Sequence, residues 1–398
     1  MKKNIAFILI FLFLLHSLRN FSNFYFLFVA VFVFLLFALS FYESNDDFGV
    51  VILFFSIAAY LYMSFFGLIF SPGDDVNALF RVWAGFPIVL AAFILQSNGI
   101  DKFCKALSVI YVLAAFSLIW QYIFGPISWF AEPSERAGGV RFSSLVGSLT
   151  AYGSAVGIAF VGSFLYFKGI KKVFFIILIF IGAVLSLQKS SILNIGISFV
   201  FLWYLGFIKK RYILLSLSLI SVFFIAIMMI APNEGMLGSA YHLIAGIVYS
   251  DSEISNDVTI AQSIIDRLTE LPLEALNFHA STLVTGAGYF GGAGVFGYND
   301  VPMAHNGIIE IICIFGYIFG FLINLIMLGY FIFCFKYLIE LRTKSSKEIK
   351  FLCFSYILWF ANNSMTGGGL FQPVMASIFW MILFRMVFVA KNRSLYEV

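Results

Sequence analysis

Apolar runs of membrane-spanning length recur along almost the whole chain, and they constrain its fold more than any other feature. A helix that crosses the hydrocarbon core of a bilayer needs about 20 consecutive, mainly apolar residues. The polar breaks predict about twelve such helices, at 4–18, 24–42, 48–70, 78–96, 103–125, 143–167, 171–187, 190–208, 212–231, 305–335, 350–366 and 371–390. Because backbone groups in lipid must be hydrogen-bonded within the chain, the sequence predicts an all-α fold, with residues 1–398 forming one polytopic membrane bundle.

The composition agrees with a membrane protein and argues against a soluble one. Of the 398 residues, 62% are hydrophobic and only 11% are charged, against about 25% charged in an ordinary soluble domain. Lys2 and Lys3 precede the first apolar run as they would in a signal peptide. That run lacks a small-residue cleavage motif before Arg19, so we expect it to remain as a signal-anchor helix.

The basic residues indicate an orientation. Cytoplasmic loops of membrane proteins are enriched in Lys and Arg. With the N-terminus in the cytoplasm, most of the 24 basic residues fall on the cytoplasmic side, and the alternation holds at every predicted turn. We therefore expect an even number of spans, with both termini in the cytoplasm.

The cations on the outward side differ in type from those inside. Lysine is sufficient to set topology, yet all but one of the outward cations are arginine. Arginine binds phosphate or carboxylate through two parallel hydrogen bonds and stays charged in a low-dielectric site. The alternative is that these side chains pair with outward carboxylates. We favour an anionic substrate at the outer face. The outward cations are Arg19, Arg81, Arg136, Arg141, Lys189 and Arg267.

Two outward segments are too long to be simple turns, a smaller loop at 125–142 and a large loop at 232–304. Loops beyond about 15 residues in compact proteins are usually functional or disordered. Between 256 and 278 the large loop has apolar residues at helical spacing, which predicts an amphipathic helix at the membrane surface. We expect Pro272 to end or kink this helix and Arg267, beside the apolar stripe, to reach a site at the interface.

The large loop ends in two features that suggest a binding site. Its glycine-rich stretch, 286–297, is expected to be too flexible to pack, so that Gly286 and Gly288 allow backbone N–H groups to approach a ligand. An ordinary linker is the alternative. The loop then meets an apolar helix at Ala304-His305-Asn306-Gly307, where a histidine and an asparagine lie at the membrane surface.

Several classes of chemistry have no support in the sequence. The cysteines lie in or beside predicted spans, the histidines are not spaced as metal ligands, and neither CxxC nor HExxH occurs. A phosphate-cradling GxxxxGK loop and a basic nucleic-acid-binding face are also missing from the sequence. We therefore expect no metal, no cofactor and no nucleic-acid partner.

A pattern of residues in the second half suggests a family. Nine residues separate Asn306 from Gly316 in the helix that follows the large loop. The pattern consists of Arg267, Gly286-Ala287-Gly288, His305-Asn306, Gly316 and Gly320. With this spacing and topology, residues 136–325 resemble the O-antigen polymerase and ligase superfamily, which are polytopic membrane glycosyltransferases.

Two weaker matches lie earlier in the chain. The segment Leu185-Ser186-Leu187-Gln188-Lys189-Ser190-Ser191 is similar to the family's Ser-rich turn, but Lys189 replaces the usual arginine. Ten residues separate Arg136 from Gly147, a spacing associated with some polymerases of this group.

The resemblance implies glycosyl transfer at the periplasmic face of a bacterial inner membrane. The donor would be an oligosaccharide on undecaprenyl pyrophosphate, and cations would stabilise the departing pyrophosphate. Arg267 would act first in this role, with Arg141, Arg136, Lys189 and, more speculatively, Arg81 binding the pyrophosphate or glycan. His305 would be the general base toward the acceptor hydroxyl, or else an interfacial residue that caps the span.

The remaining implied roles concern the helix after His305. Asn306 would orient the sugar or the imidazole, and Glu310 would tune His305 if it faces the site; an ionisable residue inside a span is a functional candidate. Implied partners are the lipid-linked oligosaccharide, the bilayer, and a chain-length regulator and flippase of the same pathway.

Within this superfamily, the additional outward loop around Arg136 and the count of twelve spans favour an O-antigen polymerase, which joins lipid-linked repeat units. Three other functions remain open. An O-antigen ligase shares this layout but transfers the glycan to lipid A–core, and a capsule polymerase uses the same chemistry. A lipid-linked oligosaccharide flippase or other transporter is a different class. Transporters place charges at the bilayer midplane and often contain repeats; here the cations gather at one face, although 362–369 is compatible with a broken helix.

Overall fold

A computed structural model describes residues 2–20, 25, 31, 47–71, 76–136, 139–147, 149–209, 225, 229, 265–292, 301–340 and 346–391. Over these residues the structure is helical apart from one hairpin of two three-residue strands, β1 (Ser134–Arg136) and β2 (Gly139–Arg141). The predicted all-α class is therefore confirmed. The predicted spans 24–42 and 212–231 lie outside the described residues, except for single positions.

Four helices are long and apolar enough to cross a membrane, which indicates a multi-pass membrane protein. They are α3 (Asp47–Phe70), α5 (Asp101–Phe124), α14 (Gly307–Glu340) and α16 (Pro373–Lys391). The other helices are α1 (Lys2–Leu14), α4 (Val76–Leu95), α6 (Ala151–Tyr166), α7 (Gly169–Leu185), α8 (Lys189–Tyr204), α12 (Glu270–Phe278) and α15 (Lys347–Thr366). Short 3-10 helices are η1 (His16–Asn20), η2 (Ala280–Thr282) and η3 (Gly288–Gly292).

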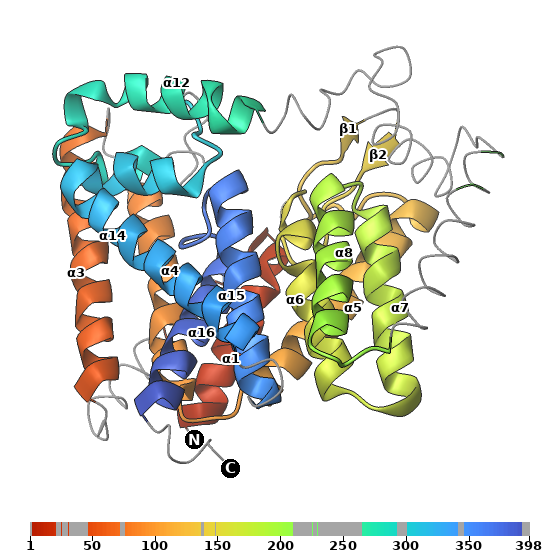
Figure 1. Cartoon of the computed structure of the whole chain (residues 1–398). Coiled ribbons are helices and arrows are strands. Elements are labelled where there is room, and N and C mark those ends of the chain that lie inside the picture. Colours follow the sequence, from red (N-terminus) through yellow and green to blue (C-terminus); the bar gives the residue numbers. More distant parts are fainter. Residues whose placement is uncertain are drawn as a thin grey trace.

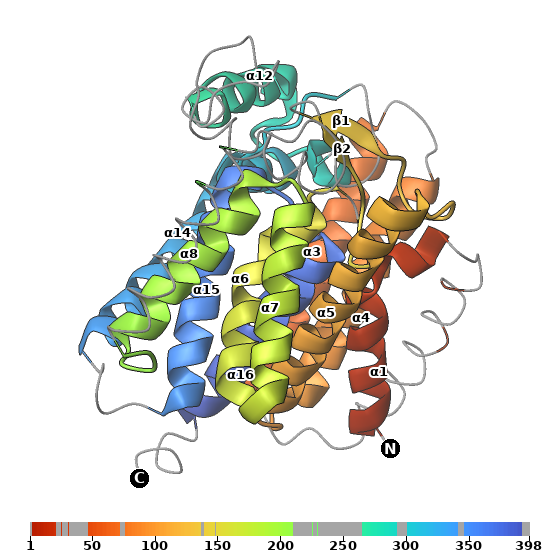
Figure 2. The same cartoon turned by 90° about the vertical axis from the view of Figure 1, so that its right-hand side faces the viewer.

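The long helices stand side by side, and α12 lies across one end of the bundle (Figure 1). The β1–β2 hairpin is at the same end, which we call the α12 end (Figure 2). Helix α1 begins and α16 finishes at the opposite end. Helix α12 and the hairpin therefore lie at one end of the bundle, and the start of α1 and the end of α16 lie at the other.

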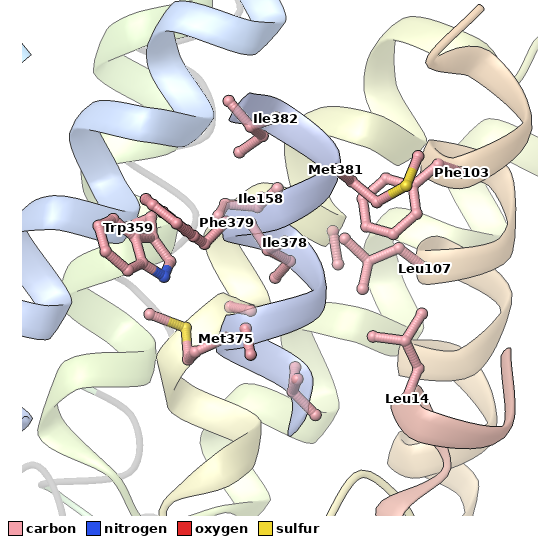
Figure 3. Close-up of a cluster of buried hydrophobic side chains, with 14 of the residues drawn as sticks. Leu14, Phe103, Leu107, Ile158, Trp359, Met375, Ile378, Phe379, Met381 and Ile382 are labelled. Atoms are coloured by element: carbon pink, nitrogen blue, oxygen red, sulfur yellow. The ribbon is translucent and has the colours of Figure 1, made fainter. Parts of the chain in front are cut away.

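The centre of the bundle is held by large apolar side chains around α16. Figure 3 shows Phe379 of α16 beside Trp359 of α15, and Met381 facing Phe103 of α5. The rings of Trp359 and Phe379 are 4.4 Å apart between centroids. Lipid tails are as apolar as these side chains, so close packing contributes more here than removal from water.

A buried ion pair ties four helices together at the opposite end. Arg385 Nε of α16 lies 2.7 Å from Glu348 Oε1 of α15. Arg385 Nη1 donates to the Gln96 carbonyl (2.8 Å) just beyond α4, and the Ile100 N–H, just before α5, donates to Glu348 Oε1 (3.2 Å). These bonds satisfy the polar groups that the surrounding helices bury.

The predicted span at 305–335 is not a single straight helix, because α14 is broken within it. Gly316 has φ 78° and ψ 174°, so the helix breaks there. Asn324 Nδ2 donates to the Ile308 carbonyl (2.9 Å), although residues 16 apart in a straight helix are about 24 Å apart. Residues 307–315 therefore form a short limb that folds back against the long limb, 317–340. Figure 1 shows the short limb beneath α12, and Ala275 of α12 packs in one apolar cluster with its Cys313.

The glycine-rich stretch was expected to be too flexible to pack, and this is wrong for its described part, 286–292. Ala287 N–H donates to the Cys313 carbonyl (2.8 Å), and Tyr317 N–H donates to the Leu283 carbonyl (2.8 Å). These bonds use backbone groups that the break at Gly316 releases from α14. Ala287 and Tyr289 are fully buried, and η3 packs between α3 and α14.

Helix α6 begins later than the predicted span at 143. Ser17 Oγ donates to the Ser144 carbonyl (2.7 Å), and Gln121 Nε2 donates to the Ser143 carbonyl (2.8 Å). Gly147, at φ 131°, closes a turn with its N–H on Ser144. Side-chain bonds thus replace the first helical turns of the predicted span, and α6 starts at Ala151.

Candidate functional site

Arg267 belongs to the helical segment that leads into α12. Residues 265–268 are helical, Thr269 leaves helical geometry with φ −126° and ψ −71°, and α12 then begins at Glu270. Pro272 lies in the first turn of α12, where its missing N–H is tolerated. The helix is interrupted at Thr269, three residues before the proline, and not at Pro272 itself. Arg267 Nη1 donates to the Met365 carbonyl (3.0 Å) in the last turn of α15.

His305 lies two residues before the short limb of α14, within range of the positive charge of Arg267. It is half-buried and has φ 46°, which is unusual for a residue other than glycine. Burial lowers the pKa of His305 below its usual value, and the charge of Arg267 lowers it further. Both segments contact the α15–α16 turn, Arg267 through Met365 and Asn306, next to His305, through Gly367. The lowered pKa favours a neutral imidazole at pH 7.

Asn306 and Glu310 have contacts that differ from their expected roles. Asn306 Oδ1 caps the short limb of α14 by accepting from the N–H groups of Ile308 (3.0 Å) and Ile309 (3.3 Å). The carboxylate of Glu310 accepts from the Gly368 N–H rather than contacting His305 in the described structure. Both residues thus hold the backbone around His305 in place.

The turn between α15 and α16 also belongs to this site, although the sequence pattern did not predict it. Gly367 and Gly368 have positive φ of 72° and 70°. Asn363 Oδ1 accepts from the Gly369 N–H (2.8 Å), and the same turn contacts Arg267 through Met365 and Glu310 through Gly368. Three consecutive glycines after a pair of asparagines were the available signal; only the fold shows that they face the loop containing His305.

Arg141 and Lys189 lie at a second corner of the α12 end. Tyr122 Oη donates to the Val140 carbonyl (2.9 Å) of β2 and to the Leu185 carbonyl (3.1 Å) at the end of α7. Arg141 ends β2 and is buried, and Lys189 begins α8 and is half-buried. The hairpin and the α7–α8 turn are therefore adjacent, which brings these two predicted binding residues to one corner.

A pair of amide side chains connects the two corners. Asn194 Nδ2 of α8 donates to Asn362 Oδ1 of α15 (3.1 Å) and to the Gly153 carbonyl of α6 (2.7 Å). Gln188 Oε1, in the turn before α8, accepts from the Gly153 N–H (2.9 Å). Helices α6, α8 and α15 are thus linked through polar contacts below the site.

For the other predicted binding residues, the structure gives the backbone position but no contact to a site among the described residues. Arg136 pairs with Gly139 in the hairpin and Arg81 lies within α4, but both side chains fall outside the described part of the chain. Gly286 and Gly288 pack against the backbones of Ile314 and Met63. Their α-carbons face helices, so we leave them out of the proposed ligand site.

No protein-family model matches the chain, and no curated protein matches it. Within the described ranges, no three His, Cys, Asp or Glu side chains are grouped to hold a metal ion. The geometry at the α12 end is therefore the basis for the proposed function.

Proposed function

We propose that the chain is an O-antigen polymerase, a membrane glycosyltransferase of polysaccharide biosynthesis. It joins oligosaccharide repeat units carried on undecaprenyl pyrophosphate and releases that lipid. One observation carries the proposal: at the end of a membrane bundle, Arg267 and the segment containing His305 both lie against the α15–α16 turn, and burial and the charge of Arg267 lower the pKa of the imidazole. This arrangement suits a reaction with an anionic leaving group and a hydroxyl nucleophile.

The proposed reaction needs no group other than side chains. His305 takes the proton from an acceptor hydroxyl, whose oxygen bonds to the anomeric carbon of the donor sugar. The bond from that carbon to the pyrophosphate oxygen breaks, and the electron pair leaves with undecaprenyl pyrophosphate. Arg267 stabilises the negative charge that develops on the leaving group. A neutral imidazole is the form that accepts a proton, so its lowered pKa keeps it competent near neutral pH.

The second corner provides further cations for a large anionic donor. The β1–β2 hairpin, which ends in Arg141, lies at the α12 end (Figure 2), and Tyr122 links it to the end of α7, four residues before Lys189. We propose that Arg141 and Lys189 bind the pyrophosphate or charged sugars of the glycan, together with Arg136 and Arg81. A donor that spans both corners would lie across the top of α6, α8 and α15.

We also propose an arrangement in the bacterial inner membrane with about twelve spans, both termini cytoplasmic and the α12 end periplasmic. It is supported by the position of the first and last described helix ends opposite α12. A cysteine placed at Ser281 should react with a membrane-impermeant thiol reagent in intact spheroplasts. Labelling only after the membrane is broken would invert this orientation.

Deletion of the gene in a Gram-negative host tests the function directly. Lipopolysaccharide on a gel should then show core with a single repeat unit. Bare core with long polymer still on the carrier lipid would instead indicate a ligase, and bare core without periplasmic polymer would indicate a flippase. An unchanged ladder would overturn the proposal and point to capsule or another pathway.

A further inference from the structure

Asn363, in the last turn of α15, has one side-chain atom whose bonding the fold does not explain. The residue is only 2% exposed. Its Oδ1 accepts from the Gly369 N–H (2.8 Å), which fixes the orientation of the amide. Its Nδ2 is buried and has no hydrogen-bond partner among the described residues. Buried amide donors almost always have partners, so this donor needs an explanation.

The amide of Asn363 lies against the start of the short limb of α14. A Cβ added to Gly307 would collide with Asn363 Nδ2, so the amide occupies the space beside that α-carbon. Gly307 is the first residue of α14. The N-terminus of a helix has a partial positive charge and attracts anions. An unpaired donor and a positive helix end therefore meet at one point.

The adjacent backbone is also held in an unfavourable conformation. His305, two residues before Gly307, has φ 46°, a left-handed conformation that disfavours side chains other than glycine. Such conformations persist where surrounding contacts impose them, and they gather at functional sites. A movement of 305–307 would release His305 from this conformation and also open the space in front of Asn363 Nδ2.

We infer that Asn363 is a substrate-binding residue whose Nδ2 donates to a phosphate oxygen of the pyrophosphate donor once 305–307 moves. This inference rests on the proposed function and adds the α15–α16 turn to its site. Arg267, which contacts Met365 on the same turn, would bind the same group. Glu310 of α14 also contacts this turn, because its side-chain oxygen accepts from the Gly368 N–H. The ligand class is a pyrophosphate or phosphate ester.

The replacement Asn363→Asp tests the inference with little change of shape. An aspartate oxygen still accepts from the Gly369 N–H, but the donor becomes an acceptor that repels phosphate. We expect inorganic pyrophosphate to bind the purified full-length variant at least roughly tenfold more weakly, measured by calorimetry in detergent. In polymerisation assays KM for the donor should rise more than kcat falls.

Asn362→Asp is the matched control. Asn362 is adjacent, also buried, and its Nδ2 already donates to the Leu358 carbonyl (2.8 Å). Its pairing with Asn194 is structural, so this variant should lose thermal stability while the folded protein keeps its affinity for pyrophosphate. If Asn363→Asp does not fold, Asn363→Ala removes the donor without adding charge and should also weaken binding.

The outcomes separate the inference from the proposed function. Unchanged pyrophosphate affinity in the folded Asn363 variant overturns the inference, as does a wild-type protein that binds no pyrophosphate, even if polymerisation is found. The protein could also bind pyrophosphate through Asn363 but lack polymerase activity. That result would support the anion site and overturn the proposed function.

Discussion

The two ends of the bundle use charged side chains in different ways. At the opposite end, Arg385 and Glu348 contact each other at 2.7 Å and together bind backbone groups next to α4 and α5. At the α12 end, Arg267 donates to the Met365 carbonyl and Glu310 accepts from the Gly368 N–H. Here each ionisable side chain contacts the backbone of the α15–α16 turn.

This difference separates structural charges from functional ones. An ion pair that cancels its own charge and joins four helices contributes to folding, and losing one partner leaves a buried charge. A ligand atom can replace a contact between an ionisable side chain and a backbone carbonyl or N–H. We therefore expect substitutions at the opposite end to change stability and those at the α12 end to change activity.

His305→Ala should give the largest effect of all. Removing a general base lowers the rate by roughly 100- to 10,000-fold, while the protein should still insert and fold. The measurement is polymer length on a lipopolysaccharide gel after complementation of a deletion strain, with membrane levels checked by immunoblot. Normal polymer from this variant would remove His305 from the mechanism.

Glu348→Gln should give the largest loss of stability. It leaves Arg385 without a counter-charge in a buried site, which costs about 3 kcal/mol or more. Thermal denaturation in detergent should show a lower midpoint, and the protein that remains folded should keep its activity. The double variant Glu348→Gln with Arg385→Met should recover part of the loss, and an unaltered midpoint in the single variant would contradict the structural role.

Arg267→Lys should reduce activity about tenfold or more, because it keeps the charge but loses the planar pair of donors. The thermal midpoint should stay close to that of the wild type. Full activity would mean that Arg267 acts only as a point charge. A large fall in the midpoint would make this residue structural, like Arg385.

The pH dependence should give the smallest but most specific effect. The pKa of His305 is lowered by burial and by Arg267, so activity should fall only when the pH drops below this lowered value. Arg267→Gln removes the positive charge, which should raise the His305 pKa and move the acid limb of the pH–rate profile to higher pH. Glu348→Gln is the control and should leave the limb in place. An acid limb unmoved by Arg267→Gln would contradict the pairing of Arg267 and His305.

Hydropathy and turn residues predicted much of the helical framework. The helices at 48–70 and 103–125 agree with α3 and α5 within two residues at each end, because their apolar runs have polar breaks on both sides. The division near Gly367 is also confirmed, since α15 ends at Thr366 and α16 begins at Pro373. Roles for Arg267 and His305 remain predictions, although both segments lie against the α15–α16 turn.

The site itself depends on contacts that no hydropathy pattern contains. The break in α14 is held by Ala287 N–H on the Cys313 carbonyl and by Asn324 on Ile308, which are pairings of distant backbone and side-chain groups. The same applies to the turn at Gly368, whose N–H is bound by Glu310 of another helix. A glycine in the sequence indicates where another segment can pack closely against the backbone, but it does not identify that segment.

The central claim, that the α12 end transfers glycans from a lipid pyrophosphate, is tested most directly by reconstitution. Purified protein in liposomes would be given undecaprenyl-pyrophosphate-linked repeat units, with products separated by length. The wild type should lengthen the glycan and release undecaprenyl pyrophosphate, and His305→Ala should do neither. Lengthening by both proteins, or by neither when the repeat unit comes from the native host, would contradict the account.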